Sequence, residues 1–180
     1  ETDQKSTINS IIGSVNMDYQ FIKNFYFNSL YGMQAQFMTE KQNILGGHPV
    51  YTIMGDAGAI GDFRTTIFDW NWSNTLSYRN VFNGRHNVQA TVGMEYQDHL
   101  YENLSVRSFD KTDPRPYFDF TTVQFASNRD YTWRQIAYFS RLNYTLDSKY
   151  TLSGQLRRDG NSTLGDKKYG TFWSVGTSWN

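Results

Sequence analysis

Residues 68–97, "FDWNWSNTLSYRNVFNGRHNVQATVGMEYQ", alternate apolar and polar side chains on both sides of one short turn. Large apolar residues occupy most even positions from Phe68 to Tyr96, and polar residues occupy most odd ones. A period of two is typical of a strand with one apolar and one polar face. At the centre, Asn83 and Gly84 tolerate the positive φ angles that a type I′ turn requires. The stretch therefore predicts a two-faced β-hairpin.

The same alternation fills most of the chain, and helix-period stripes are nearly absent. Residues 10–37 predict a hairpin with its turn near 23, residues 135–158 predict another with its turn near 148, and residues 171–179 predict a seventh strand. The expected fold class is all-β, an antiparallel up-and-down sheet of about seven strands. The whole of 1–180 is expected to form part of one β-barrel domain.

The connections between these strands fall into two classes. The turns near 23, 84 and 148 are short, whereas the intervening loops, about 40–66, 98–131 and 159–170, are long and polar. Short turns at one edge and long loops at the other are typical of outer-membrane barrels, with the turns periplasmic and the loops extracellular. Seven strands do not close a bacterial barrel of this kind, which has an even number, so the chain is expected to be a segment of a larger one.

Two alternatives to a transporter barrel stay open, a passive porin-type barrel and a soluble β-sandwich that binds glycans. The strand lengths, the loop asymmetry and a polar face rich in Asn, Gln, Ser, Thr and Gly favour a membrane barrel. No apolar run is long enough for a spanning helix, and the N-terminal residues do not have the pattern of a signal peptide. The zero formal net charge argues against a nucleic-acid partner, and the absence of cysteine excludes thiol chemistry.

A set of polar residues shares one parity within the predicted strands, and we expect these residues to face the barrel lumen. They are Asp69, Gln89, Thr91, Glu95, Arg141, Gln155 and Arg157. An arginine facing lipid near the midplane would cost about 2–4 kcal/mol, so the parity of the charged members is a check on the register. We interpret them as charges that brace neighbouring strands, with substrate binding as the alternative.

No stretch predicts a catalytic, cofactor or metal site. The glycine-rich residues 55–62 match neither phosphate-binding motif, and the three histidines have no ligand spacing. "DGNS", residues 159–162, lacks the order of a calcium-binding loop. No serine stands in a nucleophile-elbow motif, and no carboxylate pair suggests hydrolysis. We therefore expect no enzyme and no cofactor.

Residues 139–179, "FSRLNYTLDSKYTLSGQLRRDGNSTLGDKKYGTFWSVGTSW", resemble a barrel stretch of the SusC/RagA family of TonB-dependent outer-membrane transporters. The family pattern has an R-x-D-G-S-S-x-[FL]-G segment, a polar loop, and then Y-G-x-F-P-[SA]-x-[SAG]-x-x-W. The matching signature residues, interpreted as structural, include Arg158, Asp159, Gly160, Ser162, Gly165, Tyr169, Gly170 and Trp179. Asn161 and Trp173 depart from the pattern, where a serine and a proline are usual.

The resemblance implies a barrel of about 22 strands, with an N-terminal plug and a TonB-contacting segment that are not recognisable in these residues. It implies import of oligosaccharides or peptides with a SusD-like surface lipoprotein, powered through the TonB complex, in the outer-membrane lipid of a member of the Bacteroidetes. The long loops, above all 98–131 with "DPRPYFDF", are then candidates for a lid or for substrate contact. By parity Leu156 faces lipid and Arg158 follows it outward, so the strand must leave the hydrocarbon before Arg158.

Overall fold

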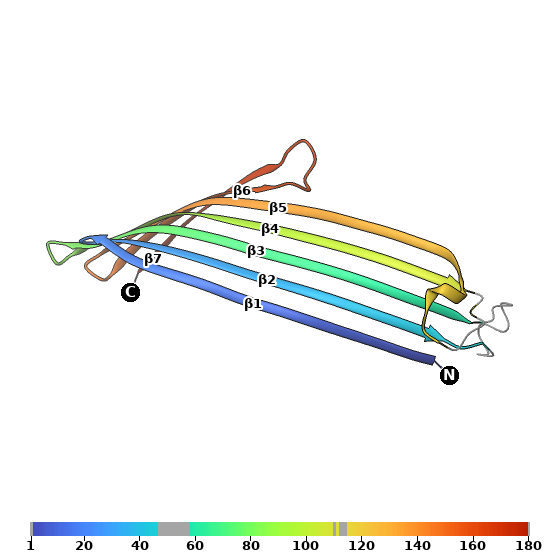
Figure 1. Ribbon diagram of the computed structural model, residues 1–180. Helices are drawn as coiled ribbons and strands as arrows, with labels where there is room; N and C mark the ends of the chain where they lie inside the picture. Colours follow the sequence, from blue (N-terminus) through green and yellow to red (C-terminus); the bar gives the residue numbers. More distant parts are fainter. Residues whose placement is uncertain (1, 47–57, 110, 112–114, 180) are drawn as a thin grey trace. The chain divides into compact units, whose positions relative to one another are not determined.

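The computed structural model describes residues 2–46, 58–109, 111 and 115–179. Its strands form one seven-stranded sheet in sequence order (Figure 1). They are β1 (Thr2–Ile22), β2 (Phe25–Ile44), β3 (Ala59–Phe82), β4 (His86–Phe109), β5 (Thr122–Leu146), β6 (Tyr150–Asn161) and β7 (Tyr169–Trp179), with a short 3₁₀ helix η1 (Phe118–Phe120) before β5. The predicted all-β, antiparallel, up-and-down sheet of seven strands is confirmed. No helix among the described residues has the length and apolarity needed to cross a membrane.

The three short turns lie where the sequence predicted them, and their backbone angles explain the residues found there. Asn83 and Gly84 have φ of 49° and 67°, as a type I′ turn requires. Asp147 and Ser148 have φ of 53° and 55°, so the β5–β6 turn has the same positive angles without a glycine. Asn24, in the first turn, also has a positive φ, of 71°.

The long connections are shorter than the sequence predicted. β2 continues to residue 44, β3 begins at 59, β4 continues to 109 and β5 begins at 122. Much of 40–66 and 98–131 is therefore strand, and the third connection narrows from 159–170 to 162–168. In the added part of β4, the charged residues Asp98 and Glu102 interrupt the apolar positions, so the alternation that identifies a strand in the sequence is weaker although backbone pairing continues.

The chain divides into two compact units, and each is described by itself. Unit 1 comprises residues 1–11, 34–68 and 100–132, and unit 2 comprises 12–33, 69–99 and 133–180. Unit 1 holds most of the few buried apolar residues of the described chain, namely Ala35, Ile44, Ala59 and Ile60. Ser108 is also buried there, and its hydroxyl donates to Thr121 Oγ1 at 2.6 Å.

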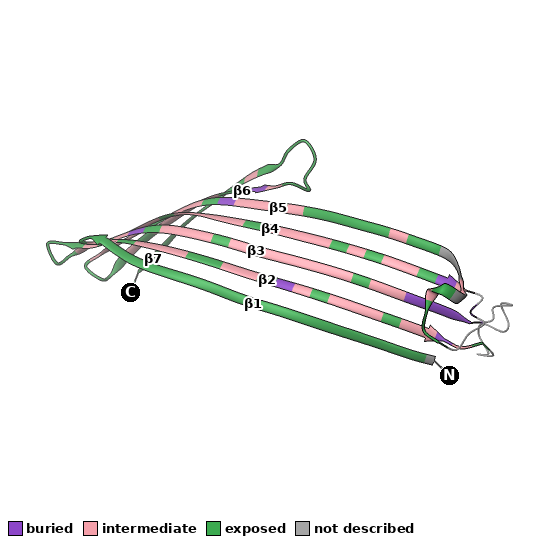
Figure 2. Ribbon diagram, in the orientation of Figure 1, coloured by how far each residue is buried: buried purple, intermediate pink, exposed green. Residues whose placement is uncertain are grey.

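Unit 2 leaves large apolar side chains exposed on one face of its sheet. Val92 is 52% exposed, Leu156 51% and Trp173 77%, and Figure 2 shows how little of the sheet is buried. Leu156 pairs with Trp173 across β6–β7 and with Ser140 across β5–β6, so these side chains share a face. A single sheet with an open apolar face differs from a β-sandwich, in which a second sheet covers that face.

Candidate functional site

Arg157 is the centre of the polar face of unit 2. Its Nη2 donates to Glu95 Oε2 at 2.8 Å, and its Nε donates to Asp159 Oδ1 at 2.7 Å. The guanidinium also lies 5.9 Å from the centroid of the Phe139 ring. One arginine therefore joins carboxylates on two strands, β4 and β6, across the intervening β5.

A glycine makes this arrangement possible. A Cβ on Gly93 would lie 2.5 Å from Cζ of Phe139 and 2.9 Å from the Asn74 carbonyl oxygen. The absent side chain thus allows the Phe139 ring to approach β4 closely while it lies near the guanidinium of Arg157. Close approach to the backbone is a common reason for glycine within a strand.

The other predicted polar-face residues lie on this same face. Ser77 and Thr91 hydroxyls are 3.0 Å apart, and Arg141 Nη2 donates to Gln155 Oε1 at 3.3 Å. The Asp69 carboxylate is bonded to Nδ1 of His99, whose ring stacks on Trp133 at 5.4 Å between centroids. Gln89 shares the face with Thr91 because side chains two residues apart point the same way. These contacts join six of the seven residues to neighbours on the same face, and Gln89 is placed there by parity alone. That this face lines the lumen stays a prediction.

A groove lies on unit 1 between β4 and β5. It encloses about 660 Å³ and is lined by Tyr101, Asn103, Ser105, Arg107, Phe125, Ser127, Arg129 and Tyr131. Tyr101 and Tyr131 stack at 5.0 Å between centroids, and Arg107 lies 4.9 Å from the centroid of Phe63. No carboxylate is among the described residues that line the groove. The groove therefore presents aromatic rings, amide and hydroxyl groups, and positive charge.

The apolar face of unit 2 carries two groups of aromatic rings. In one, Trp70 lies between Tyr31 and Tyr96, at 5.9 and 4.9 Å between centroids. In the other, Tyr78 lies 4.8 Å from Phe25. Trp70 and Tyr78 both belong to β3 and are eight residues apart, which is about 26 Å along a strand. Aromatic girdles about 25 Å apart flank the apolar band of membrane barrels.

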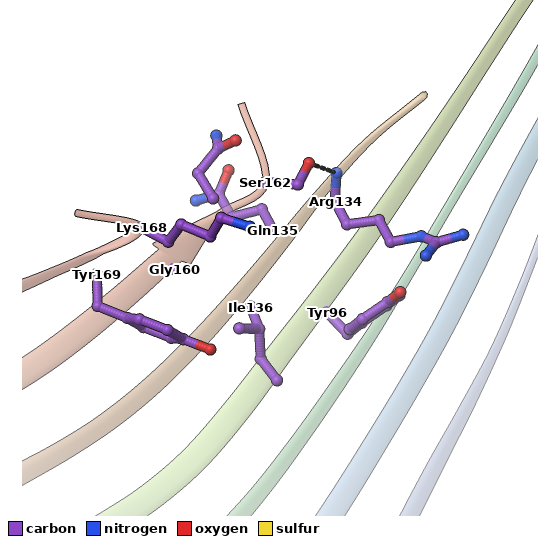
Figure 3. Close-up of a pocket in the computed structure, with 9 residues that line it drawn as sticks. Tyr96, Arg134, Gln135, Ile136, Gly160, Ser162, Lys168 and Tyr169 are labelled. Carbon is purple, nitrogen blue, oxygen red and sulfur yellow. Dashed lines mark hydrogen bonds between the residues drawn. The ribbon is translucent and has the colours of Figure 1, made fainter. Parts of the chain in front are cut away.

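A smaller pocket, of about 210 Å³, opens where β5, β6 and β7 approach the 162–168 connection. Figure 3 shows Tyr169 and Tyr96 on opposite sides of Ile136, with Lys168 and Arg134 toward the connection. A Cβ on Gly160 would lie 2.5 Å from Tyr169 Cε1, so the tyrosine ring rests on the glycine. Ser162 secures the rim, because its hydroxyl accepts from the Arg134 backbone N–H at 2.8 Å.

The signature residues have structural contacts. Arg158 lies 5.0 Å from the centroid of Tyr169, Asp159 accepts from Arg157, and Trp179 stacks on Tyr150 at 6.4 Å. A Cβ on Gly170 would meet the Phe172 ring at 3.2 Å, whereas one on Gly165 would meet nothing within 4 Å. Asn161, where the family pattern has serine, accepts from the backbone N–H of Thr163 at 2.9 Å and shapes the bend.

Known proteins match this chain over most of its length. TonB-dependent receptor P26 of Formosa agariphila is 27% identical over 179 residues, which is 95% of this chain and 18% of the relative. TonB-dependent receptor P3 of the same organism is 32% identical over 175 residues, 90% of this chain and 16% of the relative. The chain is a segment of a TonB-dependent receptor β-barrel. It spans less than a fifth of the length of these curated relatives.

Solved structures show the same fold for this receptor segment. A structure of the RagAB peptide transporter matches 97% of the chain with a TM-score of 0.82 at 18% identity, covering 20% of that chain. The siderophore receptor PiuA from Acinetobacter baumannii matches with a TM-score of 0.55 at 12% identity, over 96% of this chain and 29% of that one. No family model matches the receptor segment.

Sequence reasoning missed the groove of unit 1 and the pocket beside Tyr169. It placed His99, Tyr101 and Arg129 in or beside a loop, so their common face was not recognised. Continuing the odd-position parity of β4 beyond Gln97 would have identified Tyr101, Asn103, Ser105 and Arg107. His48 and most of the glycine-rich stretch 55–62 lie outside the described residues. Of "DPRPYFDF", residues 115–120 are described, and they include an exposed Tyr117 and η1.

Proposed function

We propose that this segment belongs to a SusC-like TonB-dependent transporter, which imports oligosaccharides or peptides across a bacterial outer membrane. The observation that carries the proposal is the match of the whole seven-stranded sheet to the RagAB peptide transporter, at a TM-score of 0.82. The 139–179 signature and the kinship to TonB-dependent receptors support it. The remaining strands, the plug and the TonB-contacting segment would lie elsewhere in the full-length protein, and a SusD-like lipoprotein would cap its extracellular mouth.

In this proposal the braced polar face of unit 2 faces the lumen. The apolar face with its aromatic groups faces lipid, because exposed Val92, Leu156 and Trp173 are stabilised in hydrocarbon. The turns near 23, 84 and 148 are periplasmic, and the connections 45–58, 110–121 and 162–168 are extracellular.

The groove of unit 1 is the best candidate in this chain for contact with cargo. Stacked tyrosines provide flat surfaces for sugar rings or peptide side chains, and Arg107 and Arg129 provide charge for carboxylates. Within unit 1, the groove lies on the odd-position face of β4 and β5.

Uptake measurements test the proposed transport. The gene for the full-length protein is deleted from its host, and import of labelled oligosaccharide and peptide mixtures is compared before and after complementation. We expect import to require both the protein and a functional TonB complex. Import that persists without TonB would instead indicate a passive pore, and unchanged import after deletion would refute transport of either cargo class.

Variants of the groove test its contact with cargo. Tyr131→Ala and Arg129→Gln should each weaken binding of the imported cargo about fivefold or more, since central aromatic and arginine contacts dominate binding energy. Arg64→Gln is the matched control, because Arg64 is paired with Asp62 at 3.2 Å and does not line the groove. Equal binding by the groove variants and the control would remove the groove from the proposal. Co-purification of a surface lipoprotein with the full-length protein tests the SusD-like partner.

A further inference from the structure

The groove of unit 1 has an ordered lining, which follows from the register of the neighbouring strands β4 and β5 (Figure 1). The stacked rings of Tyr101 and Tyr131 are cross-strand neighbours, 5.0 Å apart between centroids. In an antiparallel pair, a step forward along one strand matches an equal step back along the other. The next facing pairs along the groove are therefore Asn103 with Arg129, Ser105 with Ser127, and Arg107 with Phe125. The groove thus presents, in order, two rings, an amide beside a cation, two hydroxyls, and a cation beside a ring.

The two arginines of the groove have no carboxylate to neutralise them. Both are exposed, and neither forms an ion pair with a described residue. Elsewhere in the described chain, carboxylates pair with Arg64, Arg85, Arg134 and Arg157. Arg107 instead lies 4.9 Å from the centroid of Phe63 on β3, a contact that positions the guanidinium without cancelling its charge. The same contact shows that the odd positions of β3 share the face of the groove.

The acidic side chains of the surrounding strands point away from the groove or lie beyond a further strand. Glu102 and Asp130 belong to β4 and β5, but their even positions place them on the opposite face. Glu40 of β2 shares the face of the groove, because Cβ of Gln42, two residues away, would lie 3.7 Å from a Cβ on Gly61 of β3. β3 lies between β2 and the groove. The potential within the groove is therefore positive and favours a negatively charged ligand.

The neutral part of the lining favours a sugar chain over a peptide. Tyrosine ring faces stack against the apolar faces of sugar rings, and the amide and hydroxyl groups of the groove exchange hydrogen bonds with sugar hydroxyls. Asn103 Nδ2 donates to Thr65 Oγ1 at 2.9 Å, which fixes the orientation of that amide. Among the described lining residues, no aliphatic side chain forms a pocket for an apolar peptide side chain, and no carboxylate is present to pair with an amino group.

The spacing of the groups suits an elongated ligand. Arg107 lies four residues beyond Asn103, the residue that faces Arg129, so the two arginines are about 13 Å apart along the strands. The tyrosine stack lies two residues, about 7 Å, on the other side of Arg129. A chain of several sugar residues can therefore place one ring at the tyrosines and separate charged groups at the two arginines.

We propose that this groove selects oligosaccharides that carry carboxylate or sulfate groups. Arg129 and Arg107 bind two of these groups at separate points of the sugar chain, and Tyr101 and Tyr131 stack against an adjoining sugar ring. A guanidinium binds an oxyanion through paired N–H donors, which suits both kinds of group. The inference rests on the proposed contact of this groove with cargo, and it adds the charge and the chemical class of that cargo.

Equilibrium binding to the purified full-length protein in detergent, measured by titration calorimetry, tests the selection. The probes are an oligogalacturonide, a sulfated galactan oligosaccharide, the neutral counterpart of each made by carboxyl reduction or desulfation, and an acidic peptide of similar length. We expect the wild type to bind an acidic oligosaccharide about tenfold more tightly than its neutral counterpart, because hydrogen bonds between charged groups are strong. The carboxylated and sulfated probes show which of the two anions is preferred.

Variants of the two arginines assign the preference to the groove. Arg129→Gln should reduce the preference for the acidic probe about fivefold, and the double variant Arg107→Gln/Arg129→Gln should abolish it, while binding of the neutral probe stays the same. Arg129→Lys should restore part of it, because lysine keeps the charge but not the paired donors. Arg64→Gln is the matched control, since Arg64 pairs with Asp62 and lies on the opposite face of β3. Unfolding would lower the binding of both probes alike, so the ratio of the two affinities reports charge recognition.

Several outcomes would overturn the proposal. They are equal affinity of the wild type for acidic and neutral probes, an unchanged ratio in the double variant, and no binding of either acidic oligosaccharide. Tighter binding of the acidic peptide would assign the groove to peptides instead.

Tyr131→Ala distinguishes a failure of this inference from a failure of the proposed cargo contact. Removal of the ring should weaken the binding of acidic and neutral probes alike. If it does so while the arginine variants leave the affinity ratio unchanged, the groove contacts cargo without selecting its charge. If it weakens neither probe, the groove makes no contact with cargo.

Discussion

Arg157 and Arg158 are neighbours on β6, yet their surroundings are opposite. Arg157 lies on the polar face and donates to Glu95 and Asp159 at 2.8 and 2.7 Å. Arg158 lies on the apolar face, where its guanidinium is 5.0 Å from the Tyr169 ring centroid. On the polar face charges are braced by acidic residues along the strands, whereas on the apolar face they begin only beyond Leu156. Strand parity thus assigns the two arginines to opposite faces of β6, which in the proposed orientation are the lumen face and the lipid face.

The largest expected effect comes from moving a charge to the wrong face. Val92→Arg should abolish assembly of the barrel, since an arginine near the midplane of the lipid face costs about 2–4 kcal/mol. Thr91→Arg, one residue away on the polar face, should be tolerated. The folded fraction of the full-length protein in outer-membrane preparations, read from heat-dependent gel mobility, checks both. Equal damage by the two variants would contradict the assignment of faces.

The second-largest effect is expected from adding a side chain at residue 93, next to the Phe139 ring. Gly93→Ala should lower stability by about 1–3 kcal/mol, because the new Cβ would force Phe139 and the adjoining backbone apart. Gly154→Ala is the control, since a Cβ there would meet nothing within 4 Å. Denaturant unfolding of the full-length barrel measures both. A Gly93 variant as stable as the Gly154 variant would show that Phe139 moves without cost.

A smaller effect is expected from removing the brace itself. Arg157→Met should lower stability by about 1 kcal/mol, as is usual for partly exposed ion pairs, while Arg158→Met should leave stability nearly unchanged. A double-mutant cycle with Glu95→Gln isolates the coupling of the Arg157–Glu95 pair. A coupling energy of zero would show that the Arg157–Glu95 pair does not stabilise the barrel.

The smallest effect concerns the ion pair between two turns. Arg85 Nε donates to Asp147 Oδ1 at 2.6 Å, and this hydrogen bond, with the positive charge, holds the pKa of Asp147 below its usual 3.8. The contribution is therefore complete above pH 4 and is lost as the pH falls through the lowered pKa. The protection of the residue 147 amide against exchange, relative to an unstructured amide at the same pH, should fall in that acidic range, because its N–H donates to the Arg85 carbonyl at 2.8 Å. Asp147→Asn should remove this pH dependence, and its persistence would assign it to another group.

Most of the fold could be predicted because the membrane imposes a strict period on residues such as Val88 to Tyr96. The turns were predictable too, since an Asn-Gly pair such as Asn83-Gly84 between two alternating stretches is a strong signal for a two-residue hairpin turn. The extents of β4 and β5 were harder to predict, because charged residues such as Asp98 and Glu102 interrupt the apolar positions Leu100, Leu104 and Val106 beyond Gln97 and weaken the alternation.

The candidate sites were harder to predict for a different reason. Parity placed Glu95 and Arg157 on one face, but their contact depends on the offset between β4 and β6, which alternation does not specify. The pocket beside Tyr169 joins β4, β5 and the 162–168 connection, and the distance along the chain from Tyr96 to Lys168 conceals that proximity. Glycines were an indirect signal, since Gly93 and Gly160 each lie beneath an aromatic ring of the next strand.

The order of strands in the sheet, which equals their order in the sequence, has a consequence for biogenesis. Each new strand needs only the strand made just before it, so the sheet can grow from a single open edge as hairpins arrive. The Arg85–Asp147 pair joins two successive hairpins, and it forms only when both are present and in register. If a hairpin paired out of register, the Arg85–Asp147 ion pair would not form. Every later strand would then also pair out of register.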